Sequence, residues 1–251
     1  MYIDTHCHLS KEDYDDIEEV IKENRENHVD KIIISGCTKD TIIESLEIAN
    51  SYDDVFVTIG YHPSECSITT DEDLELLKDQ LRSSKVVGVG EIGLDYHYGR
   101  EDILLQQELF RKQMEIAEQL HLPVVIHSRD ATLDTISILK EFPNVKGDIH
   151  CFSGSLETAR IYINMGYMIG IVGVVTFKNS KLYQVVEEIG LDNILLETDA
   201  PYLTPDPYRG KKNSSKYLSY INNKIAEILD ETPQKVAEKT SENAYKLFDL
   251  D

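Results

Sequence analysis

Short runs of β-branched and apolar residues alternate along the chain with longer segments that carry apolar residues at helical spacing. This alternation favours βαβ units and a parallel sheet. The runs that read as strands are residues 2–8, 31–36, 55–61, 86–91, 123–127, 147–150, 167–171 and 193–197. Eight such units in a chain of 251 residues fit one closed (β/α)8 barrel.

The segments between the strand-like runs have the length and spacing of amphipathic helices. The expected helices are residues 12–27, 39–52, 71–82, 103–120, 131–141, 156–165 and 181–189, followed by two or three more from about residue 215. The sequence contains no internal repeat, low-complexity tract or linker. We therefore expect residues 1–251 to form a single TIM-barrel domain, with a doubly wound open sheet as the alternative.

Histidines and carboxylates stand at the ends of several strand-like runs. These candidate metal ligands are His6, His8, Glu91, His127, His150 and Asp199. In a (β/α)8 barrel the carboxyl ends of all strands open on one face, so residues far apart in sequence can build one site there. Many strand orders of an open sheet would hold the first and last strands apart, so this distribution favours the barrel.

One group of candidates joins the two ends of the chain. His6 and His8 are two residues apart on one expected strand, so both side chains point the same way and can bind one cation. Asp199 would complete the shell of that cation and could also take a proton from a bound water. Glu197 has the same strand parity and is either a supporting residue behind a ligand or a solvated, ion-paired one.

A second group lies in the middle of the chain. His127 and His150 close neighbouring apolar runs and suit a second cation, although either histidine alone would more often be a core or loop residue. Glu91 ends a buried run, where a carboxylate is costly unless it is paired or coordinating. As a bridging ligand, Glu91 could contact two cations held about 3.5–4 Å apart.

The chemistry that such a centre predicts is hydrolysis. Two cations that share a water lower its pKa and make a hydroxide available near neutral pH. The spacing of the ligands alone does not decide between attack on phosphorus and attack on a carbonyl carbon. Nitrogen and oxygen ligands suit Zn²⁺, Mn²⁺, Co²⁺ or Fe²⁺ and leave room for Mg²⁺.

Further candidates would contact the substrate. His62, in G-Y-H-P, could contact a substrate oxygen or donate a proton, or it could be a loop histidine held by Pro63. Asp199, His62 and Glu91 are thus the candidate catalytic residues. The basic residues Arg129, Lys178, Arg209 and Lys211 follow expected strands and are either oxyanion clamps or solvated surface charges.

Composition limits the partners. The formal net charge of −21 argues against a protein that coats nucleic acid through bulk electrostatics. An apolar stretch long enough to cross a membrane is absent, and the N-terminus does not resemble a signal peptide, so we expect a cytoplasmic protein. We identify no obligate protein partner. The four cysteines are scattered and read as free thiols, with Cys7 and Cys151 as packing residues.

Ordered motifs along nearly the whole chain resemble the TatD family of metal-dependent deoxyribonucleases. They are D-T-H-C-H-L, G-Y-H-P, G-E-I-G-L-D-Y, L-P-V-V-I-H-S-R-D-A, H-C-F-S-G, G-V-V-T-F-K and L-L-E-T-D-A-P-Y-L to R-G-K-K-N. The resemblance implies a (β/α)8 barrel with two divalent metals, and a DNase that acts exonucleolytically from the 3′ end. The implied ligands are His6, His8, Glu91 and Asp199 for the first metal, and Glu91, His127 and His150 for the second. His62 and Arg129 would lie near the scissile phosphate.

The chain departs from the family pattern after R-G-K-K-N, where relatives usually carry a proline and this sequence reads S-S-K-Y. This departure leaves the choice of substrate open. DNA, as single strands or ends, is the leading substrate. A small amide, lactone or aminoacyl ester hydrolysed at the same site is the alternative, and an inactive barrel that binds a partner is a third reading.

Overall fold

Eight parallel strands form one sheet in the order β1 to β8 in the computed structural model, which describes residues 1–97 and 101–250. The strands are β1 (Tyr2–Cys7), β2 (Val29–Gly36), β3 (Val55–Ile59), β4 (Val86–Asp95), β5 (Val124–Arg129), β6 (Gly147–Ile149), β7 (Met168–Ile171) and β8 (Ile194–Leu196). Every strand pairs in parallel with the next one in sequence, which excludes the doubly wound order.

Hydrogen bonds between the first and last strands close the barrel. The amide of Asp199 donates to the carbonyl of His6 at 3.0 Å, and the amide of His8 donates to Ala200 at 2.7 Å. The hydroxyl of Thr5 donates to the carbonyl of Leu196 at 3.1 Å. The residues after β8 are therefore fixed directly beside the candidate ligands of β1.

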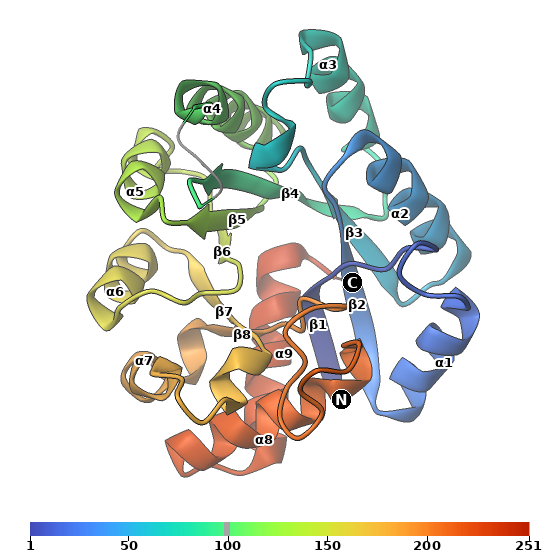
Figure 1. The fold of residues 1–251 in the computed structure, drawn as a ribbon, viewed down its shortest axis with the longest axis vertical. Coiled ribbons are helices and arrows are strands. Elements are labelled where there is room, and N and C mark those ends of the chain that lie inside the picture. Colours follow the sequence, from blue (N-terminus) through green and yellow to red (C-terminus); the bar gives the residue numbers. More distant parts are fainter. Residues whose placement is uncertain (98–100, 251) are drawn as a thin grey trace.

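Helices surround the strands in Figure 1. They are α1 (Ile17–Glu26), α2 (Lys39–Ser51), α3 (Asp71–Gln80), α4 (Ile103–Leu120), α5 (Thr132–Glu141), α6 (Leu156–Asn164), α7 (Leu182–Ile189), α8 (Leu218–Leu229) and α9 (Pro233–Phe248). Side chains that accept from the first-turn amides fix several helix starts, including Thr38 before α2, Thr70 before α3 and Ser155 before α6. None of the helices in the described ranges is long and apolar enough to cross a bilayer.

The amino-terminal end of the barrel is filled by apolar side chains and covered by α9, which lies beside β1 and β8 in Figure 1. The buried cluster there consists of Ile3, Ile33, Phe56, Val87, Val125, Leu195, Ala244, Phe248 and Leu250. Burying these side chains favours the folded state and makes the interior of the barrel apolar at this end. The open end is the one at which the strands finish.

Two strands run beyond the ends that the sequence predicts. β4 continues past Glu91 to Asp95, and β5 continues past His127 to Arg129, because Leu94 pairs with Ser128 and Asp95 with Arg129. A Cβ on Gly93 would lie 2.0 Å from the carbonyl oxygen of His127, and Gly93 has φ of +143°, so only glycine permits this pairing. The prediction that the fourth strand ends at Glu91 is therefore wrong.

Candidate metal centre

Four side chains meet where β1 and β8 close the barrel. The Nε2 atoms of His6 and His8 are 3.3 Å apart. They lie 3.6 and 3.9 Å from Oε2 of Glu91, and 3.9 and 3.6 Å from Oδ1 of Asp199. Two imidazole nitrogens that converge beside two carboxylates offer nitrogen and oxygen ligands to one point, and this donor set fits a divalent cation.

The second group shares Glu91 with the first. Its Oε1 atom is 2.7 Å from Nδ1 of His127, whereas its Oε2 atom faces His6 and His8. Nε2 of His150 is 3.5 Å from Oδ1 of Asp199. Because the two oxygens of Glu91 face different histidines, this carboxylate can serve two cations at once, as the sequence suggested.

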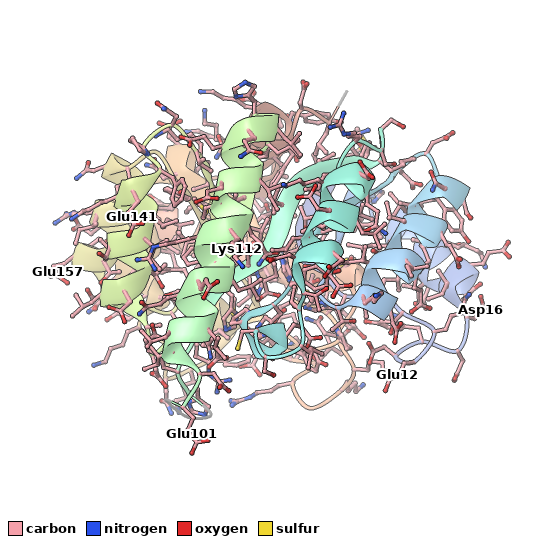
Figure 2. All side chains as sticks on the ribbon, turned by 90° about the horizontal axis from the view of Figure 1, so that it is seen from above. Glu12, Asp16, Glu101, Lys112, Glu141 and Glu157 are labelled. Atoms are coloured by element: carbon pink, nitrogen blue, oxygen red, sulfur yellow. The ribbon has the colours of Figure 1, made fainter. Side chains whose placement is uncertain are left out.

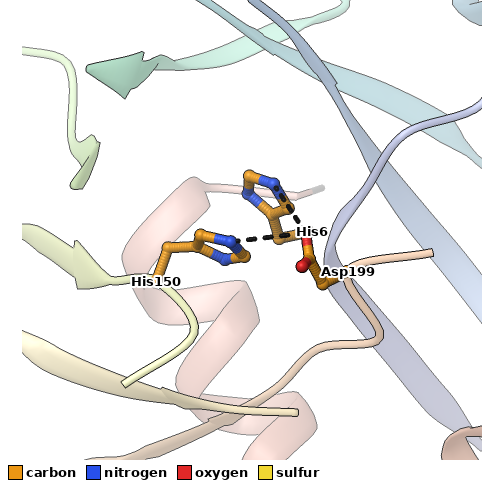
Figure 3. Close-up of side chains that lie close together, drawn as sticks. All are labelled: His6, His150 and Asp199. Carbon is orange, nitrogen blue, oxygen red and sulfur yellow. Dashed lines mark ion pairs between the residues drawn. The ribbon is translucent and has the colours of Figure 1, made fainter. Parts of the chain in front are cut away.

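The two groups form one continuous centre. Figure 3 shows His6, His150 and Asp199 converging, with the carboxylate of Asp199 close to a nitrogen of each imidazole. The rings of His6 and His150 stack with centroids 3.6 Å apart, and His6 is fully buried. Asp199 adopts φ of +55°, which turns its carboxylate toward these rings just after β8. Side chains from both ends of the sequence thus meet in one buried polar pocket.

Two further carboxylates hold the histidines from behind. Nε2 of His127 is 3.0 Å from Oδ2 of Asp95, and Nδ1 of His150 is 3.0 Å from Oε2 of Glu197. The opposite nitrogen of each ring, Nδ1 of His127 and Nε2 of His150, faces the centre. Each carboxylate therefore fixes the tautomer and the orientation of a candidate ligand. The structure favours the supporting role for Glu197 over the solvated one, because Glu197 is fully buried.

The position of Glu197 depends on a glycine in the neighbouring strand. A Cβ on Gly170 of β7 would lie 2.4 Å from the carboxyl carbon and from both oxygens of Glu197. The amide of Cys151 also donates to Oε2 of Glu197 at 3.0 Å. The carboxylate therefore sits inside the barrel in a space that only glycine leaves open.

Electrostatics agree with a cation site. Burial would raise the pKa of Glu91, but the hydrogen bond from His127 and the charge of His150 outweigh burial and hold it well below its usual range. The same balance, with contacts from His150 and His8, lowers the pKa of Asp199. Both carboxylates are ionised at neutral pH. Burial lowers the pKa of His6 to about 3, so its imidazole is neutral and available as a ligand.

Removing one supporting carboxylate tests this arrangement. Asp95→Asn keeps the size of the side chain but removes the charge behind His127, and we expect metal affinity to fall roughly 10–100-fold. Glu197→Gln should give a comparable loss through His150. Metal affinity measured by competition with a chelator is the readout. Asp130→Asn, at an exposed aspartate of the same rim, is the matched control, and an Asp95→Asn affinity equal to that of the control would contradict the assignment.

His62 faces this centre from the loop after β3. Its ring lies 4.7 Å from that of His127 between centroids. The amide of Ser64 donates to Nδ1 of His62 at 3.2 Å, and burial lowers the pKa of the imidazole to about 4. A neutral ring that accepts at Nδ1 carries its proton on Nε2, so His62 can donate a hydrogen bond to a substrate oxygen. The same hydrogen bond caps the turn at Pro63–Glu65, as the loop alternative expects, so a substrate contact at His62 stays a prediction.

The candidate basic residues occupy the rim. Arg129 and His150 line a cavity of about 430 Å³. Burial would raise the pKa of Asp95, but the hydrogen bond from His127 outweighs burial and lowers it, and the charge of Arg129 adds a smaller lowering. Arg209 lies over the ring of Phe177 at 4.2 Å, and Lys211 lies over Tyr208 at 5.3 Å. Lys178 is exposed. Within the described part of the chain, Lys178, Arg209 and Lys211 make no hydrogen bond or ion pair with the candidate ligands.

Sequence reasoning missed two residues of the centre. Asp95 lies past Glu91, where the sequence pattern predicts that the fourth strand has already ended. Cys37 follows β2, and its Sγ atom lies 3.7 Å from Oε2 of Glu91. The motif G-L-D-Y begins two residues after Glu91 and contains Asp95. It is a sequence signal for this residue, because residues 91, 93 and 95 share the parity of one strand.

The cysteines agree with the expectation in part. The described cysteines are all free, and Cys7 packs in the core with 2% of its surface exposed. Cys151, by contrast, lies beyond the end of β6 with φ of +47° and lines the cavity beside His150. The alternation of side chains along a strand does not extend past the strand end, so it gives no support to the packing role expected for Cys151.

Comparison with known sequences identifies the family of this chain. Residues 3–249 match the family described as TatD related DNase. The uncharacterized metal-dependent hydrolase YabD of Bacillus subtilis is 43% identical to this chain, and the match covers 99% of each protein. The uncharacterized metal-dependent hydrolase YcfH of Escherichia coli is 32% identical, over 99% of this chain and 96% of the relative.

Solved structures resemble the whole chain as well. The crystal structure of YjjV, a TatD homologue from Escherichia coli, gives a TM-score of 0.91 at 31% identity and covers 100% of this chain and 98% of that one. A TatD family hydrolase from Entamoeba histolytica gives a TM-score of 0.88 at 22% identity, with the same coverage, and shares the fold.

Proposed function

Because the chain belongs to the TatD family of metal-dependent hydrolases, we propose that it is a deoxyribonuclease that removes nucleotides from the 3′ end of single-stranded DNA. The observation that carries this proposal is the meeting of six ligand-type side chains around the shared carboxylate of Glu91. We propose two divalent cations per chain, one held by His6, His8, Glu91 and Asp199, the other by Glu91, His127 and His150.

The residues around the cations divide the work of hydrolysis. Bound divalent cations supply an acidic water and polarise the phosphoryl oxygens. Asp199 is ionised and faces the imidazoles of His8 and His150, so it is placed to accept a proton from the attacking water. The neutral ring of His62 donates a hydrogen bond to a non-bridging oxygen, and Arg129 stabilises the charge that develops on the phosphate.

The charge of the protein directs the substrate to the rim. Exposed carboxylates cover the outer helices and loops, among them Glu12, Asp16, Glu141 and Glu157 in Figure 2. This surface repels a polyanion, so DNA can approach only where basic residues gather. The loop of residues 201–214 carries Arg209, Lys211 and one further lysine against a single aspartate. Such an arrangement admits a strand end more readily than it admits a long duplex.

A nuclease assay across metals tests the proposal. Purified protein is stripped of metal, reloaded separately with Mg²⁺, Mn²⁺, Co²⁺ or Zn²⁺, and given a single-stranded oligonucleotide labelled at its 5′ end. We expect products that shorten by one nucleotide at a time from the 3′ end. An oligonucleotide blocked by a 3′ phosphorothioate linkage is the control. DNA that stays intact with every metal would overturn the proposal.

The same centre could act on carbon instead of phosphorus. A net charge of −21 favours a small or weakly charged substrate, which keeps amides, lactones and aminoacyl esters as the alternative. A panel of these compounds assayed beside the oligonucleotide separates the two. Hydrolysis of a lactone or ester with DNA left intact would replace the proposed substrate but keep the proposed centre.

Metal binding should release protons. Burial opposes protonation of His127, but its contacts with Asp95 and Glu91 outweigh burial and raise the pKa of this imidazole to about 9 in the metal-free protein. Below pH 9 the cation must displace a proton from His127. The affinity for the metal should therefore fall by about tenfold for each unit by which the pH decreases, for each proton displaced. Calorimetric titration in buffers with different ionisation enthalpies measures the number released. An affinity that is constant between pH 6.5 and 9 would contradict this account.

A further inference from the structure

An exposed aromatic ring stands beside the metal centre. Tyr202 has 59% of its surface exposed, and its ring lies 6.2 Å from that of His8 between centroids, at an angle of 67°. Exposed aromatic residues are common on protein surfaces and need no explanation by themselves. This ring differs from the others because it lies next to His8, a candidate ligand of the first cation.

Hydrogen bonds hold the backbone that carries this ring. The amide of Tyr202 donates to the carbonyl of Asp199 at 2.8 Å, which ties the turn to a candidate ligand. The side-chain amide of Asn213 donates to the carbonyls of Tyr202 and Thr198, and Asn213 is fully buried. A ring on so constrained a backbone loses little conformational entropy when it binds a partner.

The surroundings match a platform for single-stranded nucleic acid. Such proteins combine basic side chains, which follow the phosphates, with aromatic rings on which bases stack. The loop that begins at Tyr202 carries Arg209, Lys211 and Lys212 but only one acidic residue, Asp206, in a chain that is otherwise strongly acidic. A base is joined to its phosphate through one sugar, so a phosphate at the cations leaves its base close to a ring that adjoins His8.

We infer that Tyr202 stacks on the nucleobase next to the scissile phosphate and so selects unpaired strand ends. This inference rests on the proposed deoxyribonuclease function and specifies how that site holds its substrate. A base can lie on a side chain only after it has left its own stack, so a paired base inside a duplex is excluded. Because every base has an aromatic face, the contact is tolerant of sequence.

The test compares Tyr202→Ala with Tyr202→Phe, which keeps the ring. The substrates are a single-stranded oligonucleotide and the same strand with a tetrahydrofuran abasic residue at the reacting end. For the normal strand, we expect Tyr202→Ala to raise KM on the order of tenfold to a hundredfold, and Tyr202→Phe to stay near the wild type. The abasic residue should cost the wild type a similar factor and Tyr202→Ala almost nothing.

Two controls separate stacking from a structural role. Tyr183→Ala removes another exposed tyrosine, which is 46% exposed on the outer helix α7. This variant should cleave both substrates with the KM of the wild type. Quenching of a terminal 2-aminopurine base by metal-loaded protein reports the contact without turnover, and it should be lost in Tyr202→Ala while metal content stays unchanged.

The outcomes are distinct. Equal cleavage of the normal strand by the wild type and Tyr202→Ala would overturn the stacking role alone. An equal loss on normal and abasic strands would show that the residue supports the loop and would also overturn it. If the wild type cleaves neither strand, the proposed nuclease function fails, and the stacking inference fails with it.

Discussion

Glu91→Ala is expected to lower the rate of hydrolysis by about three orders of magnitude or more, because metal assistance contributes several kcal/mol to the transition state. The two oxygens of Glu91 face different histidines, so one substitution disturbs both groups of ligands. The readouts are kcat on a single-stranded oligonucleotide and the metal content of the purified variant. Both should fall together.

The matched control for this variant is Glu12→Ala, at an exposed glutamate on the outer surface in Figure 2. It should keep the activity and metal content of the wild type. Circular dichroism should show that both variants keep the fold. A Glu91→Ala protein that folds, binds less metal and still hydrolyses the substrate at more than a tenth of the wild-type rate would contradict the central role of this carboxylate.

Removing the metals is the second change with a large expected effect. Chelation should abolish activity, and adding back a divalent cation should restore it. Chelation should also lower Tm. A ligand present at about 100 times its Kd stabilises the folded state by roughly 2.7 kcal/mol, and this corresponds to a Tm shift of roughly 5–10 °C for a chain of this size. Differential scanning calorimetry of stripped and reloaded protein measures this shift.

The stability change has a direct physical cause. Without a cation, the ionised carboxylates of Glu91 and Asp199 and the imidazoles of His6 and His8 are packed together, with His6 and Glu91 buried and the other two partly buried. Such groups are costly to bury unless they are paired or coordinating. If chelated protein keeps both its full activity and the Tm of the untreated protein, the cations do not occupy this centre.

The sequence predicts the barrel and the meeting of the six ligand-type residues because both depend on patterns of the main chain. Strands that alternate with helices set the order of the sheet, and the carboxyl ends of parallel strands open on one face. His6 and Asp199, for example, lie at opposite ends of the chain, yet closure of the ring places them side by side. No knowledge of side-chain packing was needed for that conclusion.

What the sequence does not predict depends on contacts between particular side chains. The support that Asp95 gives to His127 requires β4 to continue past Glu91, and this depends on how closely Gly93 approaches β5. The place of Glu197 depends on the absence of a side chain at Gly170. Spacing along the chain carries little information about such close approaches between strands.

The most direct test of the central claim is a count of the cations in place. Crystals of protein reloaded with Mn²⁺ would be measured for anomalous scattering. The account predicts two peaks, one among His6, His8, Glu91 and Asp199 and one among Glu91, His127 and His150, with Glu91 contacting both. A single peak, no peak, or peaks away from Glu91 would contradict it.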